Sequence, residues 1–178
     1  NGLGSRKQPR LKAGIIGAGP SGLSCASFLA KAGFEVNVYE SKPRAGGMVS
    51  GAIPSFRLNQ EAIQIDIERV KAQGVSIHYT NKIITETYQR IDQENDYLYI
   101  ATGAQRSKRL KIQGAEHQIV LDPITFLEDV KSEKQVEIGD KVVIIGAGNT
   151  AMDAARTAKR LVGSKGSVLI VYRRTKKQ

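Results

Sequence analysis

Hydrophobic positions along the chain follow the same order twice. Each time, a short β-branched run leads into a glycine-rich turn, then into a small-residue segment with helical spacing, then into a second β-branched run. The first copy covers residues 14–39 and the second covers residues 142–172. A strand–helix–strand unit of this kind implies parallel strands, because the crossover helix returns the chain to the same end of the sheet.

The segment between the two copies predicts further elements. A helix is expected to begin after Asn59 and to end at Gly74, because apolar residues recur there at intervals of three and four. Strands are expected at residues 75–79 and 96–100, and another helix begins at Asp122-Pro123. The fold class predicted is α/β, with two Rossmann-like dinucleotide-binding domains that have parallel sheets, the second of them incomplete.

Composition limits the kinds of protein this chain can be. The 178 residues are 40% hydrophobic and 25% charged, which is typical of a globular protein and argues against disorder. The longest apolar runs are far shorter than the ~20 residues of a membrane-spanning helix, so a soluble, cytoplasmic protein is expected. One cysteine, Cys25, cannot supply a disulfide, an iron–sulfur ligand set or a CxxC redox pair. Any redox chemistry therefore requires a bound cofactor.

The net charge of +10, from 27 basic and 17 acidic side chains, raises nucleic acid as a partner. The basic residues, however, gather in the first twelve residues, in the stretch 104–111 and at the end of the chain, rather than along one helix. No aromatic residues interleave them to stack on bases. Nucleic-acid binding is thus the less favoured alternative, and it would predict salt-sensitive retention on DNA.

The first glycine-rich turn, GAGPSG at residues 17–22, has the spacing of a dinucleotide-binding turn. Gly17 permits the tight turn, Gly19 lets the backbone approach a pyrophosphate, and Gly22 lets helix and strand pack closely. The phosphates would lie at the helix N-terminus, where unpaired N–H groups favour an anion. Glu40, at the end of the next strand, stands where this fingerprint places an acid on the ribose hydroxyls. The alternative is an ordinary turn and a solvated glutamate.

The second turn, GAGNTA at residues 146–151, repeats the spacing with alanine in the third glycine position, which the fingerprint tolerates. Its second strand ends differently, because Arg173 and Arg174 stand where the first unit has Glu40. Guanidinium groups can pair with the 2′-phosphate of NADP, which a carboxylate would repel. The two turns are therefore expected to hold different nucleotides, the alternative being two solvated arginines in a basic tail.

An ordered set of motifs resembles the glutamate synthase small-subunit family of flavoproteins, whose relatives include the flavin segments of dihydropyrimidine dehydrogenase and of proteins described as selenate reductases. The resemblance runs from about Lys12 to the end of the chain. Its motifs are GAGPSG, Glu40, RAGGM at 44–48, IPSFRL at 53–58, ATG at 101–103, GAGNTAMDAARTA at 146–158 and VYRR at 171–174.

The resemblance implies FAD on the first domain and NADPH on the second, with a hydride passing between nicotinamide and flavin. It assigns to FAD the pyrophosphate turn, the ribose acid, a flavin-side group and the residues near the adenine, namely Gly17, Ala18, Gly19, Pro20, Ser21, Gly22, Glu40, Ser41, Gly46, Gly47, Met48, Arg57, Ile83, Ala101, Thr102 and Gly103. It assigns to NADPH the second turn and the 2′-phosphate arginines, namely Gly146, Gly148, Asn149, Thr150, Ala151, Arg173 and Arg174.

No catalytic side chain is implied, because the flavin performs the chemistry and the protein positions it. No motif for a metal site occurs in the sequence. The expected domains are a polar tail (1–11), an FAD-binding domain (12–104), a connector (105–120) and a partial NADP-binding domain (121–178).

Two departures from the family pattern concern the ends of the chain. Family members have a cysteine-rich iron–sulfur region before the FAD domain, and they continue well beyond the second strand–helix–strand unit. The expectation is therefore an incomplete piece of an FAD-dependent NAD(P)H oxidoreductase that passes electrons to an iron–sulfur domain or a larger catalytic subunit. The alternative is a catalytically inactive dinucleotide-binding module.

Overall fold

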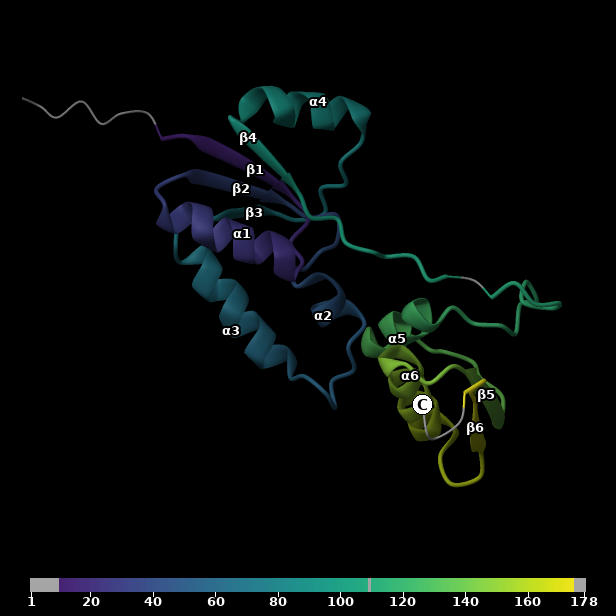
Figure 1. The fold of residues 1–178 in the computed structure, drawn as a ribbon. Helices are drawn as coiled ribbons and strands as arrows, with labels where there is room; N and C mark the ends of the chain where they lie inside the picture. Colours follow the sequence, from purple (N-terminus) through teal and green to yellow (C-terminus); the bar gives the residue numbers. More distant parts are fainter. Residues whose placement is uncertain (1–9, 109, 175–178) are drawn as a thin grey trace, which may run out of the picture. The chain divides into compact units, whose positions relative to one another are not determined.

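The computed structural model describes residues 10–108 and 110–174. They fold into two compact units, the first made of residues 10–50 and 61–103 and the second of residues 51–60 and 104–174 (Figure 1). Most of the expected polar tail, and Arg109 of the basic connector, lie outside the described residues.

A four-stranded parallel sheet in the order β3-β2-β1-β4 forms the centre of the first unit. Its strands are β1 (Lys12–Ile16), β2 (Glu35–Tyr39), β3 (Ser76–His78) and β4 (Tyr97–Ile100). Apolar residues fill the middle of β1 and β2, and Ile15, Val36 and Val38 are almost completely buried. In β1 all four residues from Ala13 to Ile16 are buried, which is typical of a parallel strand packed on both faces.

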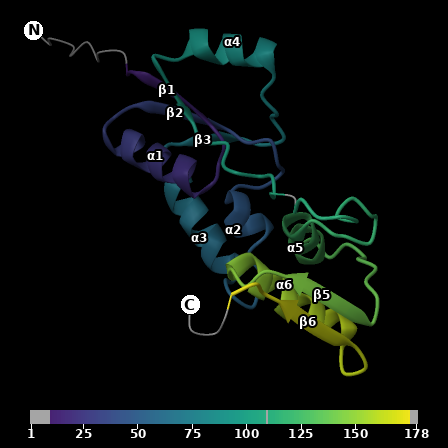
Figure 2. The same cartoon turned by 45° about the vertical axis from the view of Figure 1, so that its right-hand side comes forward.

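Helices lie on both sides of this sheet (Figures 1 and 2). The helices of the first unit are α1 (Pro20–Lys31), α2 (Gly47–Gly51), α3 (Gln60–Lys71) and α4 (Thr85–Glu94). Both α1 and α3 are on one side of the sheet, and α4 is on the other. Helix α1 begins shortly after β1 ends, so its N-terminus lies near the carboxyl end of β1. Open α/β sheets bind ligands at the carboxyl ends of their strands.

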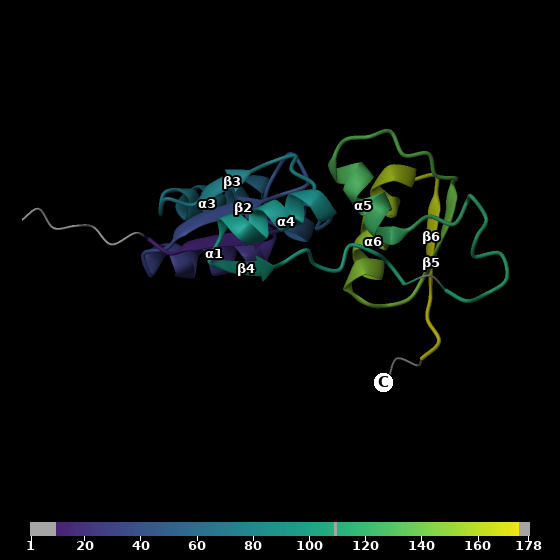
Figure 3. The ribbon, with the colours of Figure 1, turned by 90° about the horizontal axis from the view of Figure 1, so that it is seen from above.

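The second unit contains one parallel strand pair, β5 (Lys141–Ile145) and β6 (Ser167–Val171), and the helices α5 (Pro123–Lys131) and α6 (Asn149–Val162). Both helices lie on the same side of the strand pair (Figure 3). The packing face of α6 consists of small residues, among which Ala154, Ala155 and Ala158 are buried. In the described residues the other face of the pair is exposed, with Val143 57% and Leu169 60% accessible.

The structure confirms the predicted fold class, and each helix and strand predicted from the sequence is present with ends shifted by a few residues. The short helix α2 and the polar helix α4 were not predicted. Only Ile91 of α4 is buried, so this helix has almost no apolar periodicity to detect. The Thr87 hydroxyl accepts a hydrogen bond from the Ile84 amide at 2.8 Å and fixes the first turn of α4. Among the described residues, no helix has the length and apolar content needed to cross a bilayer.

The expected domain boundaries differ from the structure at residues 51–60. This segment was expected in the first domain, because its motif at residues 53–58 contains Arg57, which the resemblance assigns to FAD. In the structure it packs within the second unit. The reason is local: side chains of this segment form an ion pair and cation–π contacts with α6.

Candidate functional site

The first glycine-rich turn is closely packed by backbone. Gly17 has φ +106°, and a Cβ there would collide with the carbonyl oxygen of Ala101. A Cβ on Gly22 would collide with the carbonyl oxygen of Gly17. The Gly17 amide donates to the Tyr39 carbonyl at 2.8 Å, which ties the turn to the end of β2. Both glycines are thus required by the close approach of neighbouring chain. The motif predicted close packing for Gly22, whereas Gly17 was expected for the tight turn alone.

The turn leads directly into an uncapped helix N-terminus. Gly19 is the N-cap of α1, makes no side-chain capping bond, and is followed by Pro20. The first N–H groups of the helix are therefore left for solvent or for an anion. The Ser21 hydroxyl lies 2.9 Å from the hydroxyl of Tyr99 on β4. Tyr99 was not predicted as a site residue. In the structure it is paired with Ile15 of β1, and its side chain lies on the face of the sheet that α1 covers.

A second loop packs against this turn. The Gly46 amide donates to the Ala18 carbonyl at 2.7 Å, and a Cβ on Gly47 would approach the Gly19 Cα to 2.9 Å. Gly46 and Gly47 both have positive φ, at +103° and +53°. The loop and the turn therefore form one backbone-lined cradle. Ser50, 2% exposed, lies beneath it, and its hydroxyl has no hydrogen-bond partner in the described part of the chain.

Glu40 is buried at the end of β2 with 6% of its surface exposed. One carboxylate oxygen accepts from the Ala18 amide at 2.8 Å, and the other accepts from the Lys42 amide at 2.8 Å and from the Ser41 hydroxyl at 3.2 Å. A carboxylate offers about four acceptor positions, so these three donors leave room for one more hydroxyl. The residue therefore organises the turn as well as offering an acceptor to a ligand.

The remaining first-unit residues from the motif analysis surround the same strand ends. The Ala101 amide donates to the Ile16 carbonyl at 2.8 Å, which extends the pairing of β4 with β1 up to the turn. Gly103 has φ +70° where the chain leaves the first unit. Ile83 is half-buried two residues after Asn81, whose amide donates to the Glu40 carbonyl at 2.8 Å. The structure thus brings the predicted first-unit residues to the β1–β2 edge.

The second turn has the same backbone path with more open surroundings. Gly146 has φ +121°, and its amide donates to the Val171 carbonyl at 2.8 Å, the equivalent of the bond from Gly17 to Tyr39. A Cβ on Gly146 would meet only the Ala151 methyl at 3.7 Å. Gly148 is the N-cap of α6, without a side-chain capping bond, and a Cβ added to it would meet no atom within 4 Å. An anion could approach this helix N-terminus as well.

Arg173 and Arg174 directly follow β6 and are both exposed. Neither guanidinium has a hydrogen bond or ion pair within the described residues. Since β6 pairs with β5 up to Val171 opposite Ile145, the arginines follow at the strand edge where Gly146 begins the turn. Their charge is therefore available to an anionic group near the turn.

Arg57 does not belong to the first unit with the other residues assigned to FAD. It lies in the segment 51–60, where its Nε donates to the Asp153 carboxylate of α6. Asp153 is 7% exposed and was not predicted as a site residue. One feature of the sequence could have suggested Asp153 as a site residue. It is an acidic side chain on a helix whose packing face consists of small residues.

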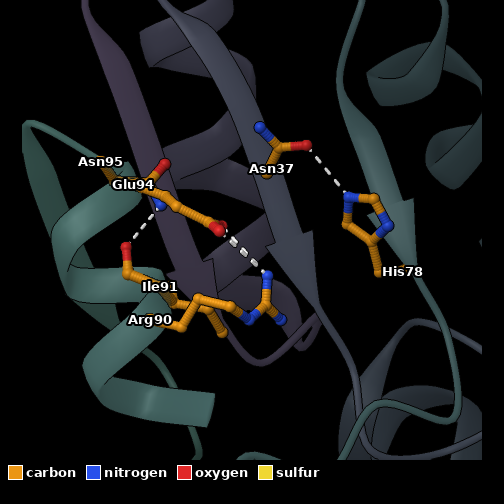
Figure 4. A network of polar contacts seen from close by, with 6 residues as sticks. All are labelled: Asn37, His78, Arg90, Ile91, Glu94 and Asn95. Carbon is orange, nitrogen blue, oxygen red and sulfur yellow. Dashed lines mark hydrogen bonds and ion pairs between the residues drawn. The ribbon is translucent and has the colours of Figure 1, made fainter.

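A polar hollow of about 360 Å³ lies between the sheet and α4, on the side away from α1. Figure 4 shows part of it, with His78 bonded to Asn37 at 3.0 Å and Arg90 paired with Glu94. Its lining residues are Lys12, Glu35, Asn37, Tyr39, His78, Asn81, Arg90, Glu94 and Asn95. None of these lining residues was predicted as a site residue.

The one cysteine does not lie in an environment that activates its thiol. Cys25 is a free thiol on α1, and burial raises its pKa. The thiolate, which is the reactive form, is thereby disfavoured.

Comparisons with known proteins place this geometry in context. The family model described as pyridine nucleotide-disulphide oxidoreductase matches residues 12–177. The NADPH–Fe(3+) oxidoreductase subunit beta of Geobacter sulfurreducens is 35% identical, over 97% of this chain and 26% of that protein. A Cereibacter sphaeroides protein named as an NADPH glutamate synthase small chain is 33% identical, over 90% of this chain and 41% of that protein.

The structure of Mycobacterium tuberculosis FprA in complex with NADPH has the same fold, with a TM-score of 0.77 and 21% identity over 93% of this chain and 44% of FprA. The resemblance inferred from the motifs is confirmed by these matches. The chain spans 15 to 41% of the length of eight curated relatives that it matches.

Proposed function

Because the chain belongs to the pyridine nucleotide-disulphide oxidoreductase family, we propose that it is the nucleotide-binding part of an FAD-dependent NADPH oxidoreductase. In this proposal the first turn binds FAD, the second binds NADPH, and electrons continue to an iron–sulfur domain or a larger catalytic subunit. The observation that carries the proposal is the contrast between two turns of one backbone geometry, one joined to Glu40 and the other to Arg173 and Arg174.

The first site fits a dinucleotide with a free ribose. The uncapped N-terminus of α1 would hold the pyrophosphate, and the remaining acceptor position of Glu40 would take a ribose hydroxyl. Gly46 and Gly47, with positive φ and no side chain, let the second loop pack directly on this turn. Met48, Ile83 and the residues 101–103 are proposed to complete the FAD contacts around this cradle, and Arg57 is the flavin-side group expected from the resemblance.

The second site fits a dinucleotide with a phosphorylated ribose. The pyrophosphate would lie on the N-terminus of α6 beside Gly148, and Asn149, Thr150 and Ala151 would line it. Arg173 and Arg174 supply the positive charge that a 2′-phosphate requires, where the first site has a carboxylate. FAD supplies the hydride chemistry when bound, and the residues of this chain bind and orient the two nucleotides.

An inactive dinucleotide-binding module is the second candidate, and one titration separates the two. The complete protein that carries this sequence is purified and its flavin absorption band is followed anaerobically as NADPH is added. We expect a bound flavin whose band is bleached by NADPH. A retained but unbleached flavin would support the inactive module, and absence of both flavin and NADPH binding would contradict both candidates.

Glu40→Gln and Glu35→Gln form the matched pair for the first site. The glutamine amide would turn an NH₂ group toward amides that now donate to Glu40, so both the turn and the ribose contact are weakened. Charge-assisted bonds contribute about 1.5–3 kcal/mol, so we expect at least about a tenfold loss of FAD affinity. Glu35 is exposed at the other end of β2, and its variant should bind FAD normally. Equal flavin content in both variants would remove Glu40 from the site.

A further inference from the structure

Residues 51–60, called the strap below, are attached to the helices of the second unit by three kinds of contact. The Lys131 ammonium of α5 donates to the Ile53 carbonyl at 2.6 Å. The guanidinium carbons of Arg156 and Arg160 on α6 lie 4.6 and 4.0 Å from the centre of the Phe56 ring. The Arg57 guanidinium pairs with the Asp153 carboxylate. Cation–π contacts of this kind and a partly buried ion pair hold the strap on α6.

The Asp153 carboxylate is the buried member of the pair, with 10% of its side chain exposed against 39% for Arg57. A buried carboxylate that loses its cation retains a desolvated negative charge. Arg57 therefore offsets a charge that the small-residue face of α6 cannot solvate.

Asp153 lies close enough to the second glycine-rich turn for its negative charge to act on an anion bound there. Asp153 is four residues beyond Asn149, the first residue of α6, which corresponds to about 6 Å along the helix axis. A pyrophosphate at the uncapped N-terminus would lie about one further turn away. Two groups of negative charge at about 10 Å repel each other appreciably at the effective dielectric of a protein.

We propose that Asp153 and Arg57 are positioning residues that set the charge of the second dinucleotide site. Arg57, delivered by the strap, cancels the repulsion between Asp153 and the pyrophosphate, so that the α6 N-terminus can hold the nucleotide. Linkage then requires the reverse effect, in which a bound nucleotide tightens the strap on α6. This inference rests on the proposed binding of NADPH at residues 146–151.

A double-mutant cycle on the complete protein tests the proposal through the Kd for NADP⁺, measured by calorimetry. Arg57→Gln should weaken binding about tenfold, because it exposes the nucleotide to the uncompensated Asp153 charge. Asp153→Asn should bind NADP⁺ at least as tightly as the wild type. The double variant should recover to within about threefold of the wild type. Arg90→Gln, which breaks an exposed pair in the first unit, is the control and should bind normally.

The signs of these changes separate the proposal from a purely structural role. Loss of binding in Asp153→Asn, or an unrecovered double variant, would overturn it, because a merely structural pair would be damaged by either change. A changed flavin spectrum in Arg57→Gln with an unchanged Kd for NADP⁺ would also overturn it and would assign Arg57 to the flavin alone. If the wild type binds no NADP⁺, the proposed function of the second turn fails together with this inference.

Hydrogen exchange on the wild type provides a test that needs no variant to fold. Saturation with NADP⁺ should slow exchange of the strap amides at residues 53 and 55–58 by a larger factor than that of the α5 amides. Equal slowing in both segments, with the 146–151 amides protected, would contradict the proposal while leaving the second turn as the NADP⁺ site.

Discussion

The two glycine-rich turns share sequence spacing and backbone path but differ in what surrounds them. In the first unit, β4 runs beside β1, and its continuation brings the Ala101 carbonyl against Gly17. In the second unit, β5 pairs with β6 alone among the described residues, and Gly146 has space for a side chain. The steric need for the first glycine of the motif is therefore set by the neighbouring strand, and the motif by itself does not determine it.

The largest expected effect comes from placing alanine at the first glycine of each turn. Both positions have positive φ, so each variant carries backbone strain of about 1–2 kcal/mol. Gly17→Ala adds a collision with the Ala101 carbonyl, at a further cost of about 1–3 kcal/mol, whereas Gly146→Ala does not. Urea denaturation, monitored in each unit by hydrogen exchange, should show a clearly larger loss of unfolding free energy for Gly17→Ala than for Gly146→Ala. Equal losses would mean that strain alone decides, and the contrast between the turns would be wrong.

The next effect concerns the charge at the strand ends. Replacing Arg173 and Arg174 together with alanine should reduce NADPH affinity at least about tenfold and leave NADH affinity nearly unchanged, because only NADPH carries the 2′-phosphate. Titration of the complete protein with each nucleotide measures this. Lys165→Ala removes an exposed cation of the same unit and serves as the control. A similar loss for both nucleotides would show that the arginines do not read the 2′-phosphate.

The smallest effect compares capped and uncapped helix starts. Asp122 caps α5 by accepting from the Ile124 and Thr125 amides at 3.0 and 2.9 Å, while α1 and α6 have no side-chain cap. Partial burial tends to raise the pKa of Asp122, but these hydrogen bonds outweigh it and the pKa is lowered. Asp122→Ala should therefore cost about 1 kcal/mol at neutral pH, measured by urea denaturation of the second unit.

The pH dependence of that cost follows from the direction of the shift. A carboxyl whose folded pKa is lowered contributes stability above its unfolded value near 4, and the contribution is lost as pH falls through the folded value. The difference between wild type and Asp122→Ala should thus be constant from pH 7 to about pH 5 and shrink below about pH 4. Asp122→Asn keeps a capping oxygen without titrating, and it should show no such pH dependence. A cost that persists unchanged at low pH would contradict an ionised cap.

The sequence predicted the elements whose signal is local. Gly17 to Gly22 and Gly146 to Ala151 lie at strand–helix junctions in the structure, and the two strand–helix–strand units are present as expected. Their apolar runs and glycines report backbone constraints that act over a few residues. The hydrogen bonds that the Ala18 and Lys42 amides donate to Glu40 were not predicted. The motif indicates only that the acid accepts from a ribose hydroxyl, and it carries no information on the loop around the acid.

The features that were missed depend on contacts between distant parts of the chain. The pair of Arg57 and Asp153 joins residues 96 positions apart, and no periodicity in either segment reveals it. Helix α4 was not predicted for another reason. Ile91 is its one buried residue, so its hydrophobic pattern resembles that of a loop. A residue pair of opposite charge in two motif segments could have suggested the contact, but many such pairs exist in a chain with 44 charged side chains, 27 basic and 17 acidic.

The strap makes the second unit discontinuous in sequence, and this has a consequence for dissecting or recombining such chains. A cut between residues 103 and 104 follows one boundary between the units. It leaves residues 51–60, which belong to the second unit, on the N-terminal fragment. The excised C-terminal piece would then carry Asp153 without its cation and Arg156 and Arg160 without the Phe56 ring. Exchange of this unit between related proteins would have to transfer two stretches of gene together, or redesign the surface of α6 that the strap covers.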